Sequence, residues 1–208
     1  MTQEELNEVL RLHKQWLESN GNKGKRADMR GANLQDADMR RADMKDAKLQ
    51  GADMRGAHMQ GADMKDAKLQ GANLQNAYLY GADMRGAHMQ GADMRGADMK
   101  DTDMRGADMK DTDMQDADLQ GANLRRANLR GADLKGANLD YSAWPLWCGS
   151  FDVKCDIRLA SQLAYHFCRL DCKDKEVVAA QNALITLANK FHRVEECGVL
   201  KPKPTLES

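Results

Sequence analysis

The chain has 208 residues and a formal net charge of −1, from 31 lysine and arginine residues against 32 aspartate and glutamate residues. This balance excludes the strongly basic surface typical of nucleic-acid binders and argues against a strongly acidic mimic of nucleic acid. No apolar run approaches membrane-spanning length, and the N-terminal MTQEEL lacks the apolar core of a signal peptide. The five cysteines are an odd number, which favours reduced thiols and a cytoplasmic protein.

Residues 2–19 carry the pattern of an amphipathic helix. Thr2 and Glu5 have the spacing of a capping box, and apolar residues with His13 among them recur on one face. The end of a repeat structure leaves strand edges and apolar side chains uncovered. We therefore expect 1–25 to be a capping helix and linker, and a helix that binds a partner is the alternative.

The next stretch, from Ala27 to Leu139, repeats with a period of five, in 23 copies. A small residue comes first, a polar residue second and Leu or Met third, and two mostly polar residues close each repeat. Five residues advance a helix by about 1.4 turns, and an odd step alternates the faces of a strand, so neither element gives one apolar face. If the chain bends once per repeat, every Leu or Met points into a core. Examples of these core positions are Met29, Leu34, Leu74, Met84, Met104 and Leu139.

The closing residue of each repeat fits a turn. It is glycine in thirteen repeats, which suits the positive φ of a type II turn. Six repeats close with aspartate instead, and four others close with Arg41, Asn76, Arg126 or Tyr141. At these ten corners we expect type I turns, which need no positive φ.

Tandem units of the form A(D/N)LxG resemble the pentapeptide-repeat family, and the resemblance covers all 23 repeats. It implies an all-β solenoid core over 26–141, a right-handed quadrilateral β-helix with four repeats per coil. At a strand spacing of about 4.8 Å, just under six coils would make a rod of roughly 28 Å. An N-terminal α-helix and a small C-terminal α-helical domain would flank this core.

Stacking every fourth repeat sorts the outward residues into columns. An acidic column of Asp43, Asp63, Asp83 and Asp103, continued by Asn123, runs beside a basic column of Lys45, Lys65, Arg85, Arg105 and Arg125, which predicts a wall of compensating charges. On another side His58, Tyr78 and Tyr80 gather as the only aromatic spot of the repeats. Exposed aromatic side chains suit protein contacts, so these three residues are the candidate partner site. The alternative is that they are substitutions tolerated on a polar surface.

The segment 142–200 departs from the repeat. Its sequences YSAWPLWCGSFDVK, YHFCRLDC and FHRVEECG, with HKQWL near the N-terminus, resemble the ends of a group of bacterial and phage pentapeptide-repeat proteins, which implies no activity. We expect it to cap the last coil with two helices that begin after Asp156 and Asp174, and 201–208 to be a flexible tail. The residues expected to point inward are Ile157, Leu159, Ala160, Leu163, Ala164, Phe167 and Cys168 in the first helix, and Val177, Val178, Leu184, Leu187, Ala188 and Phe191 in the second.

Two cysteines and two histidines of this segment could carry chemistry. Cys168 and Cys172 are four residues apart, and His166 and His192 are available. A zinc site usually needs four ligands in short paired spacings, and the chain contains no CxxC. A Cys/His nucleophile pair stays an alternative to buried structural thiols. We predict no catalytic residue, no metal and no cofactor.

The predicted function is that of a non-catalytic structural or interaction scaffold with a protein partner. The alternative is a DNA mimic that binds a type II topoisomerase and protects it from quinolones or toxins, as some pentapeptide-repeat proteins do. That role needs a dense negative surface, whereas the repeats carry 20 acidic against 17 basic residues. Neither a membrane nor nucleic acid is expected as partner, and the sequence leaves the partner and the oligomeric state open.

Overall fold

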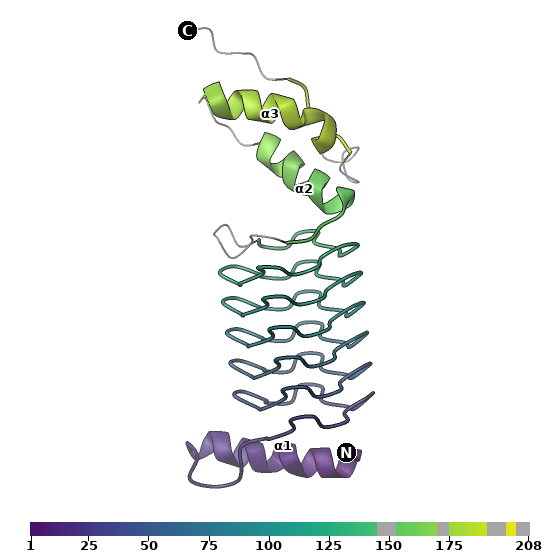
Figure 1. Cartoon of the computed structure of the whole chain (residues 1–208). Helices are drawn as coiled ribbons and strands as arrows, with labels where there is room; N and C mark the ends of the chain where they lie inside the picture. Colours follow the sequence, from purple (N-terminus) through teal and green to yellow (C-terminus); the bar gives the residue numbers. More distant parts are fainter. Residues whose placement is uncertain (145–152, 170–174, 191–198, 203–208) are drawn as a thin grey trace. The chain divides into compact units, whose positions relative to one another are not determined.

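The structure is a computed structural model that describes residues 1–144, 153–169, 175–190 and 199–202. The chain forms two compact units, Met1–Lys154 and Cys155–Ser208. The first unit contains helix α1 (Gln3–Glu18) and a stack of coils, and α1 lies across the end of that stack (Figure 1). The second unit contains helices α2 (Ile157–Cys168) and α3 (Lys175–Ala188).

Four repeats make one coil. From Asp28 to Asn123 the second residue of each repeat forms a parallel bridge with the residue 20 positions later, as Asp28 does with Lys48. Met29 N–H donates to the carbonyl of Lys48 at 2.8 Å, and Lys48 N–H donates back to the carbonyl of Ala27 at 3.0 Å. Each side of a coil thus contributes a single bridged residue. The sequence predicted an all-β solenoid, and the β-structure consists of these isolated bridges.

The preference for Asp or Asn at the second position has a local cause. The amide of the fourth residue of a repeat faces no neighbouring coil, and the Oδ1 atom of the second residue accepts its hydrogen. Examples are Gln35 N–H to Asn33 Oδ1 at 3.1 Å and Arg40 N–H to Asp38 Oδ1 at 3.1 Å. Since buried or half-buried amides need an acceptor, this side chain completes the hydrogen bonding of the repeat.

The core of the coils consists of the first and third residues of the repeats. The six example positions are all buried, with Leu74, Met84 and Met104 at 0% exposure. Thr102 and Thr112 replace alanine in this core. Their hydroxyls donate to the carbonyls of Met99 and Met109 at 2.6 and 2.7 Å, so the two buried oxygens are satisfied within their own turns.

The corners differ from the prediction. All 23 closing residues have positive φ, between +54° and +73°, so the type I turns predicted at ten corners are wrong. Every corner must aim its closing amide at the next coil, as Asp36 N–H does toward the carbonyl of Arg55 at 2.9 Å. The ladder therefore imposes one geometry on all corners. The ten non-glycine residues that adopt it are Asp36, Arg41, Asp46, Asp66, Asn76, Asp101, Asp111, Asp116, Arg126 and Tyr141.

Two glycine corners allow a matched test of this geometry. Gly71 and Gly86 have φ of +64° and +66°, but a Cβ at Gly71 meets nothing within 4 Å, whereas a Cβ at Gly86 overlaps Oδ1 of Asp66 one coil earlier. We expect Gly71→Ala to cost about 1 kcal/mol for the left-handed backbone, and Gly86→Ala about 1 kcal/mol more for the overlap. Urea denaturation measures both. In an Asp66→Gly background the extra cost of Gly86→Ala should vanish, and its persistence would contradict the overlap.

Helix α1 begins and ends as its sequence indicates. Thr2 Oγ1 accepts from Glu5 N–H at 3.2 Å, and Glu5 Oε2 accepts from Thr2 N–H at 2.8 Å, which confirms the capping box. Beyond the helix, Asn20 and Gly21 take φ of +52° and +88°, and Gly21 N–H donates to the carbonyl of Trp16. These left-handed residues turn the chain back toward the first coil.

The pairing continues past the last complete repeat. Ala143 forms a bridge with Asn123, so Ser142 to Trp144 make one further side. The structure adds a pairing that the sequence did not predict. Lys154 bridges Asp133 across a step of 21 residues, which shifts the register by one.

The second unit is built around contacts between α2 and α3. Its core contains Ala164, Tyr165, Cys168 and Ala188, with Leu184 and Leu187 packed against it. Two predicted inward residues, Ile157 and Leu163, are instead 60% and 41% exposed, so this part of the prediction is wrong. The sequence prediction also missed Tyr165, which is buried because it faces α3. The side chains of residues 159 and 167, and residues 174 and 191, lie outside the described part.

Candidate functional site

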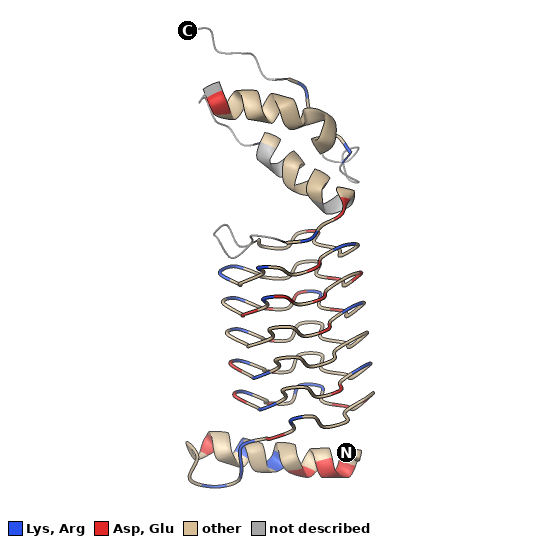
Figure 2. Cartoon of the chain, viewed as in Figure 1, with Lys and Arg blue, Asp and Glu red and all other residues tan. Residues whose placement is uncertain are grey.

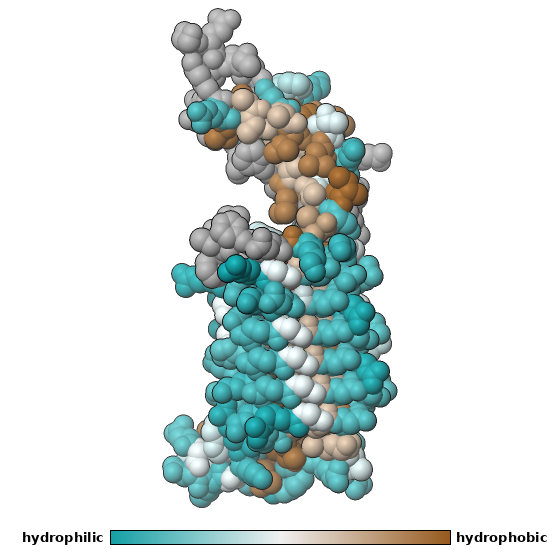
Figure 3. Space-filling view, in the orientation of Figure 1, coloured by the Kyte–Doolittle hydropathy of each residue, from teal (hydrophilic) through white to brown (hydrophobic). Residues whose placement is uncertain are grey.

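The candidate partner site is an aromatic patch, defined as His58, Tyr78 and Tyr80. His58 and Tyr78 occupy bridged positions on adjacent coils, and their rings stack with centroids 4.9 Å apart and planes 3° apart. Tyr78 is 43% and Tyr80 51% exposed. Leu79 between them points into the core, so both tyrosines point outward. The patch thus offers rigid, exposed aromatic area on coils whose visible surface is largely hydrophilic (Figure 3).

A shallow hollow of about 410 Å³ adjoins the His58–Tyr78 stack. Arg55 lies in its wall and forms a two-pronged contact with Asp53 at 2.8 and 2.6 Å, while Gln35 donates to Asp53 at 2.6 Å. The Arg55 hydrogen bonds hold the pKa of Asp53 well below its usual value, so this carboxylate stays ionised. The hollow can therefore offer ordered amide and guanidinium groups beside an aromatic face. Its lining residues are Gln35, Asp36, Arg55, Gly56, His58, Gln75, Asn76 and Tyr78.

A second side of the coils carries the predicted wall of compensating charges, here called the charge ladder. Lys45 Nζ lies 3.1 Å from a carboxylate oxygen of its own coil, on Asp43, and 3.1 Å from one of the next coil, on Asp63. The alternation continues upward and confirms the predicted pairing, and positive and negative residues are interspersed over the coils (Figure 2). Members of the ladder are Asp43, Lys45, Asp63, Lys65, Asp83, Arg85, Asp103 and Arg105.

The ladder carboxylates are held in their charged form. Burial alone would raise the pKa of Asp83, but hydrogen bonds from Arg85 and Lys65 outweigh it and lower the pKa to about 2. Ion pairs exposed to this degree contribute little stability individually. The ladder is therefore a neutral wall rather than a dense negative surface.

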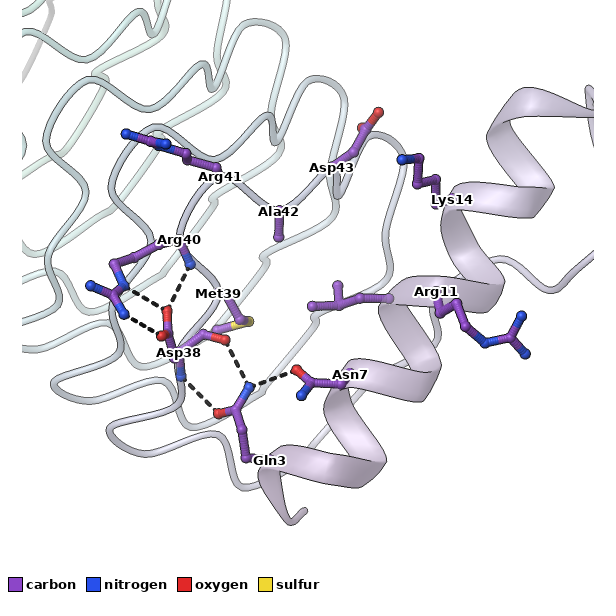
Figure 4. A pocket seen from close by; sticks show the side chains of 11 residues that line it. Gln3, Asn7, Arg11, Lys14, Asp38, Met39, Arg40, Arg41, Ala42 and Asp43 are labelled. Atoms are coloured by element: carbon purple, nitrogen blue, oxygen red, sulfur yellow. Dashed lines mark hydrogen bonds and ion pairs between the residues drawn. The ribbon is translucent and has the colours of Figure 1, made fainter.

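A groove of about 690 Å³ lies between α1 and the first coil (Figure 4). At one end the side-chain amide of Gln3 donates to the carbonyl of Asp38 at 2.9 Å and accepts from its N–H at 3.0 Å. The first coil has no preceding coil to pair with, and the side chain of Gln3 makes the two hydrogen bonds that the backbone of such a coil would make. Arg40 is tied to Asp38 at 2.6 Å, so the charged wall of the groove is already paired there. The groove belongs to the N-terminal cap.

His13 joins this cap to the first coil by hydrogen bonds. It is completely buried, its Nδ1 accepts from Ala27 N–H at 3.1 Å, and its Nε2 lies 2.9 Å from the carbonyl of Lys45. Because an amide can only donate, His13 must be neutral with its proton on Nε2. Burial lowers its pKa below the usual 6.5, although the Lys45 carbonyl acts in the opposite direction. The sequence placed His13 on the buried face but did not reveal these two partners.

The cysteines and histidines of the second unit form no site that the structure describes. Cys168 is buried and its thiol donates to the carbonyl of Gln181 at 3.3 Å. Cys172, His192 and the side chain of His166 lie outside the described residues. Among the described residues no three His, Cys, Asp or Glu side chains are placed to hold a metal ion. Within the same residues no helix has the length and apolar character needed to cross a membrane.

The comparisons with known proteins concern the coils. Residues 25–61, 62–101, 72–111 and 102–140 match a sequence family described as pentapeptide repeats, with eight copies. No curated protein matches the chain.

Solved structures of pentapeptide-repeat proteins resemble parts of the chain. Rfr23 from the cyanobacterium Cyanothece 51142 is 21% identical over 62% of this chain and 84% of its own, with a TM-score of 0.34. HetL from Nostoc sp. PCC 7120, involved in heterocyst differentiation regulation, is 24% identical over 62% and 77%, with a TM-score of 0.23. Full-length QnrB1, a plasmid-mediated fluoroquinolone resistance protein, is 19% identical over 71% and 75%, with a TM-score of 0.30.

Proposed function

This chain belongs to the pentapeptide-repeat family, and from that premise we propose that it is a non-catalytic scaffold that binds a protein partner. We further propose that its coils form a right-handed quadrilateral β-helix. The 20-residue bridging step supports four sides per coil. A rigid framework of this kind holds outward side chains in fixed positions, which lowers the entropy cost of binding.

The aromatic patch is the observation that carries this proposal. The stacked rings of His58 and Tyr78 are already ordered before any partner arrives, and Tyr80 adds a second exposed ring. Aromatic side chains are enriched in the buried centre of protein interfaces, where a few residues contribute most of the binding energy. The hydrogen-bonding groups of Gln35 and Gln75 beside the stack supply the polar rim that such an interface needs.

A comparison of variants tests the patch. Tyr78→Ala with Tyr80→Ala removes the exposed rings without touching the core, so the fold should persist by circular dichroism. A protein captured from the native host by the wild-type chain should bind the double variant at least about tenfold more weakly in a direct titration with purified partner. His88→Ala, which changes an exposed side chain of another column, is the matched control. Equal binding by all three proteins would contradict the proposal.

Topoisomerase protection is the alternative, and the charge ladder argues against it. Lysine and arginine residues neutralise the carboxylates along one wall, whereas a DNA mimic needs them unopposed. We therefore expect no relief of quinolone inhibition in a gyrase supercoiling assay. Protection at protein concentrations close to that of the enzyme would overturn this expectation and favour the mimic.

The division of the chain into 1–25, 26–141, 142–200 and 201–208 stays a proposal. The capping role of the first segment is supported by the bonds that Gln3 and His13 make to the first coil. For 142–200 the support is physical, because an uncovered last coil would leave amide and carbonyl groups free to pair with another molecule.

A further inference from the structure

The charge ladder follows a rule that identifies where it ends. Each basic residue contacts the carboxylate of its own coil and that of the next coil. Lys65 lies 3.0 Å from Asp63 and 3.0 Å from Asp83, and Arg85 lies 2.8 Å from Asp83 and 3.8 Å from Asp103. Because neighbouring bases share each carboxylate between them, the number of acids equals the number of bases, and this part of the wall is neutral.

The rule fails after Asp103. Arg105 contacts Asp103 at 2.6 Å, but the position one coil later is Asn123, which carries no charge. Arg125 has Asn123 in its own coil and Ala143 in the next. Asn123 Oδ1 accepts only the backbone N–H of Arg125, at 3.3 Å. Arg125 therefore has no carboxylate partner within the described part of the chain.

The neighbouring corner adds another positive charge. Arg126 closes its repeat with φ of +62°, where most corners have glycine, aspartate or asparagine. An arginine in this left-handed conformation costs about 1 kcal/mol relative to glycine. Its side chain is exposed and, like that of Arg125, forms no ion pair among the described residues.

The arginines surround a hollow. A cavity of about 490 Å³ is lined by Arg85, Arg105, Gly106, Arg125 and Arg126. The space beside Gly106 is open, because a Cβ placed there would meet nothing within 4 Å. Among the residues that the structure describes, only Asp83 and Asp103 are paired with these four guanidinium groups, which leaves the hollow an excess of two positive charges.

We propose that Arg105, Arg125 and Arg126 form a binding site for a phosphate group, either free phosphate or a phosphate monoester. A phosphate monoester carries about −1.5 to −2 charges at neutral pH, which matches the excess in the hollow. Guanidinium groups bind phosphate oxygens in two-pronged geometry and lose less hydration than an ammonium group. Asn123 and Ala143 occupy positions where the ladder has carboxylates in earlier coils, and the phosphate supplies the negative charge that these two residues lack. The site shares no residue with the aromatic patch, so it is independent of the protein-binding role.

Calorimetric titration of the full chain at constant ionic strength tests the site. Inorganic phosphate is the probe in one arm and O-phosphoserine in the other, which distinguishes free phosphate from a monoester. Asn123→Asp restores the missing ladder carboxylate at nearly constant shape and should weaken binding at least about tenfold. Asp103→Asn releases Arg105 and should tighten binding. Melting curves should show that both variants fold.

Asn33→Asp is the control for net charge, because it adds the same charge at an exposed second position four coils away. It should change the phosphate affinity by less than about twofold. Binding of either probe by the wild type, weakened by Asn123→Asp alone, supports the site. The proposal is overturned if neither probe binds the wild type, if Asn33→Asp weakens binding as much as Asn123→Asp, or if Asp103→Asn fails to tighten it.

Discussion

Replacing Leu74 with aspartate is expected to lower the free energy of unfolding by at least about 4 kcal/mol. Leu74 is completely buried in the middle of the coils, between Met54 and Met94 of the same column. A carboxylate there would have no hydrogen-bond donor and no room for water. Thr102 shows the contrast, since its buried hydroxyl donates to the carbonyl of its own turn. Urea denaturation followed by circular dichroism measures the change.

Two variants control this experiment. Leu74→Met keeps the volume and copies residues already present in the column, so it should cost less than about 1.5 kcal/mol. Asp83→Ala removes an outward carboxylate with two ion pairs and should cost less than about 1 kcal/mol. Similar losses for Leu74→Asp and Asp83→Ala would contradict the inward and outward positions of the repeat.

Replacing His13 with leucine is expected to cost about 2 to 4 kcal/mol, because two backbone groups lose their partners. Ala27 N–H would lose its acceptor and the carbonyl of Lys45 its donor, both beneath α1. The stacking of His13 with Trp16, at 5.6 Å between ring centroids, would be lost as well. Gln3→Ala is the control, because its bonds to Asp38 are exposed and should contribute less than about 1 kcal/mol.

The same residue predicts how stability depends on pH. The pKa of His13 in the folded chain lies below its usual 6.5, so on acidification the unfolded chain takes up the proton first. The stabilisation is complete above about pH 6.5 and is lost as the pH falls toward the lowered pKa. Denaturation midpoints between about pH 7.5 and about pH 5.5 should therefore fall with pH in the wild type, and fall less in His13→Leu. Equal slopes would show that His13 is not held neutral.

The sequence predicted the residues of the aromatic patch but not the phosphate site. Tyr78 and Tyr80 stand out because the repeats contain no other Phe, Trp or Tyr before Tyr141, and His58 lies one coil before Tyr78. The arginine hollow was not predicted, although Arg125 and Asn123 lie in columns that a step of 20 identifies. What the sequence did not show was that each base of the ladder bridges two coils, and that Arg125 therefore lacks both of its acids.

The sequence by itself determined which residues are buried in the coils, because each repeat packs on a copy of itself 20 residues later. A period of five then assigns Leu74 and Met84 to the core without any knowledge of the rest of the chain. The capping box of α1 was equally evident, since Thr2 and Glu5 satisfy amides within one helical turn.

Only the tertiary structure decided the features that depend on contacts between unlike segments. Asp66 takes a positive φ because the ladder of the next coil requires it, against its local preference for a type I turn. His13 is neutral because two backbone groups from distant parts of the chain meet its ring. In α2 the exposure of Ile157 and the burial of Tyr165 follow from where α3 packs. The contacts of His13, Ile157 and Tyr165 each occur once in the chain, so no repeat in the sequence records them.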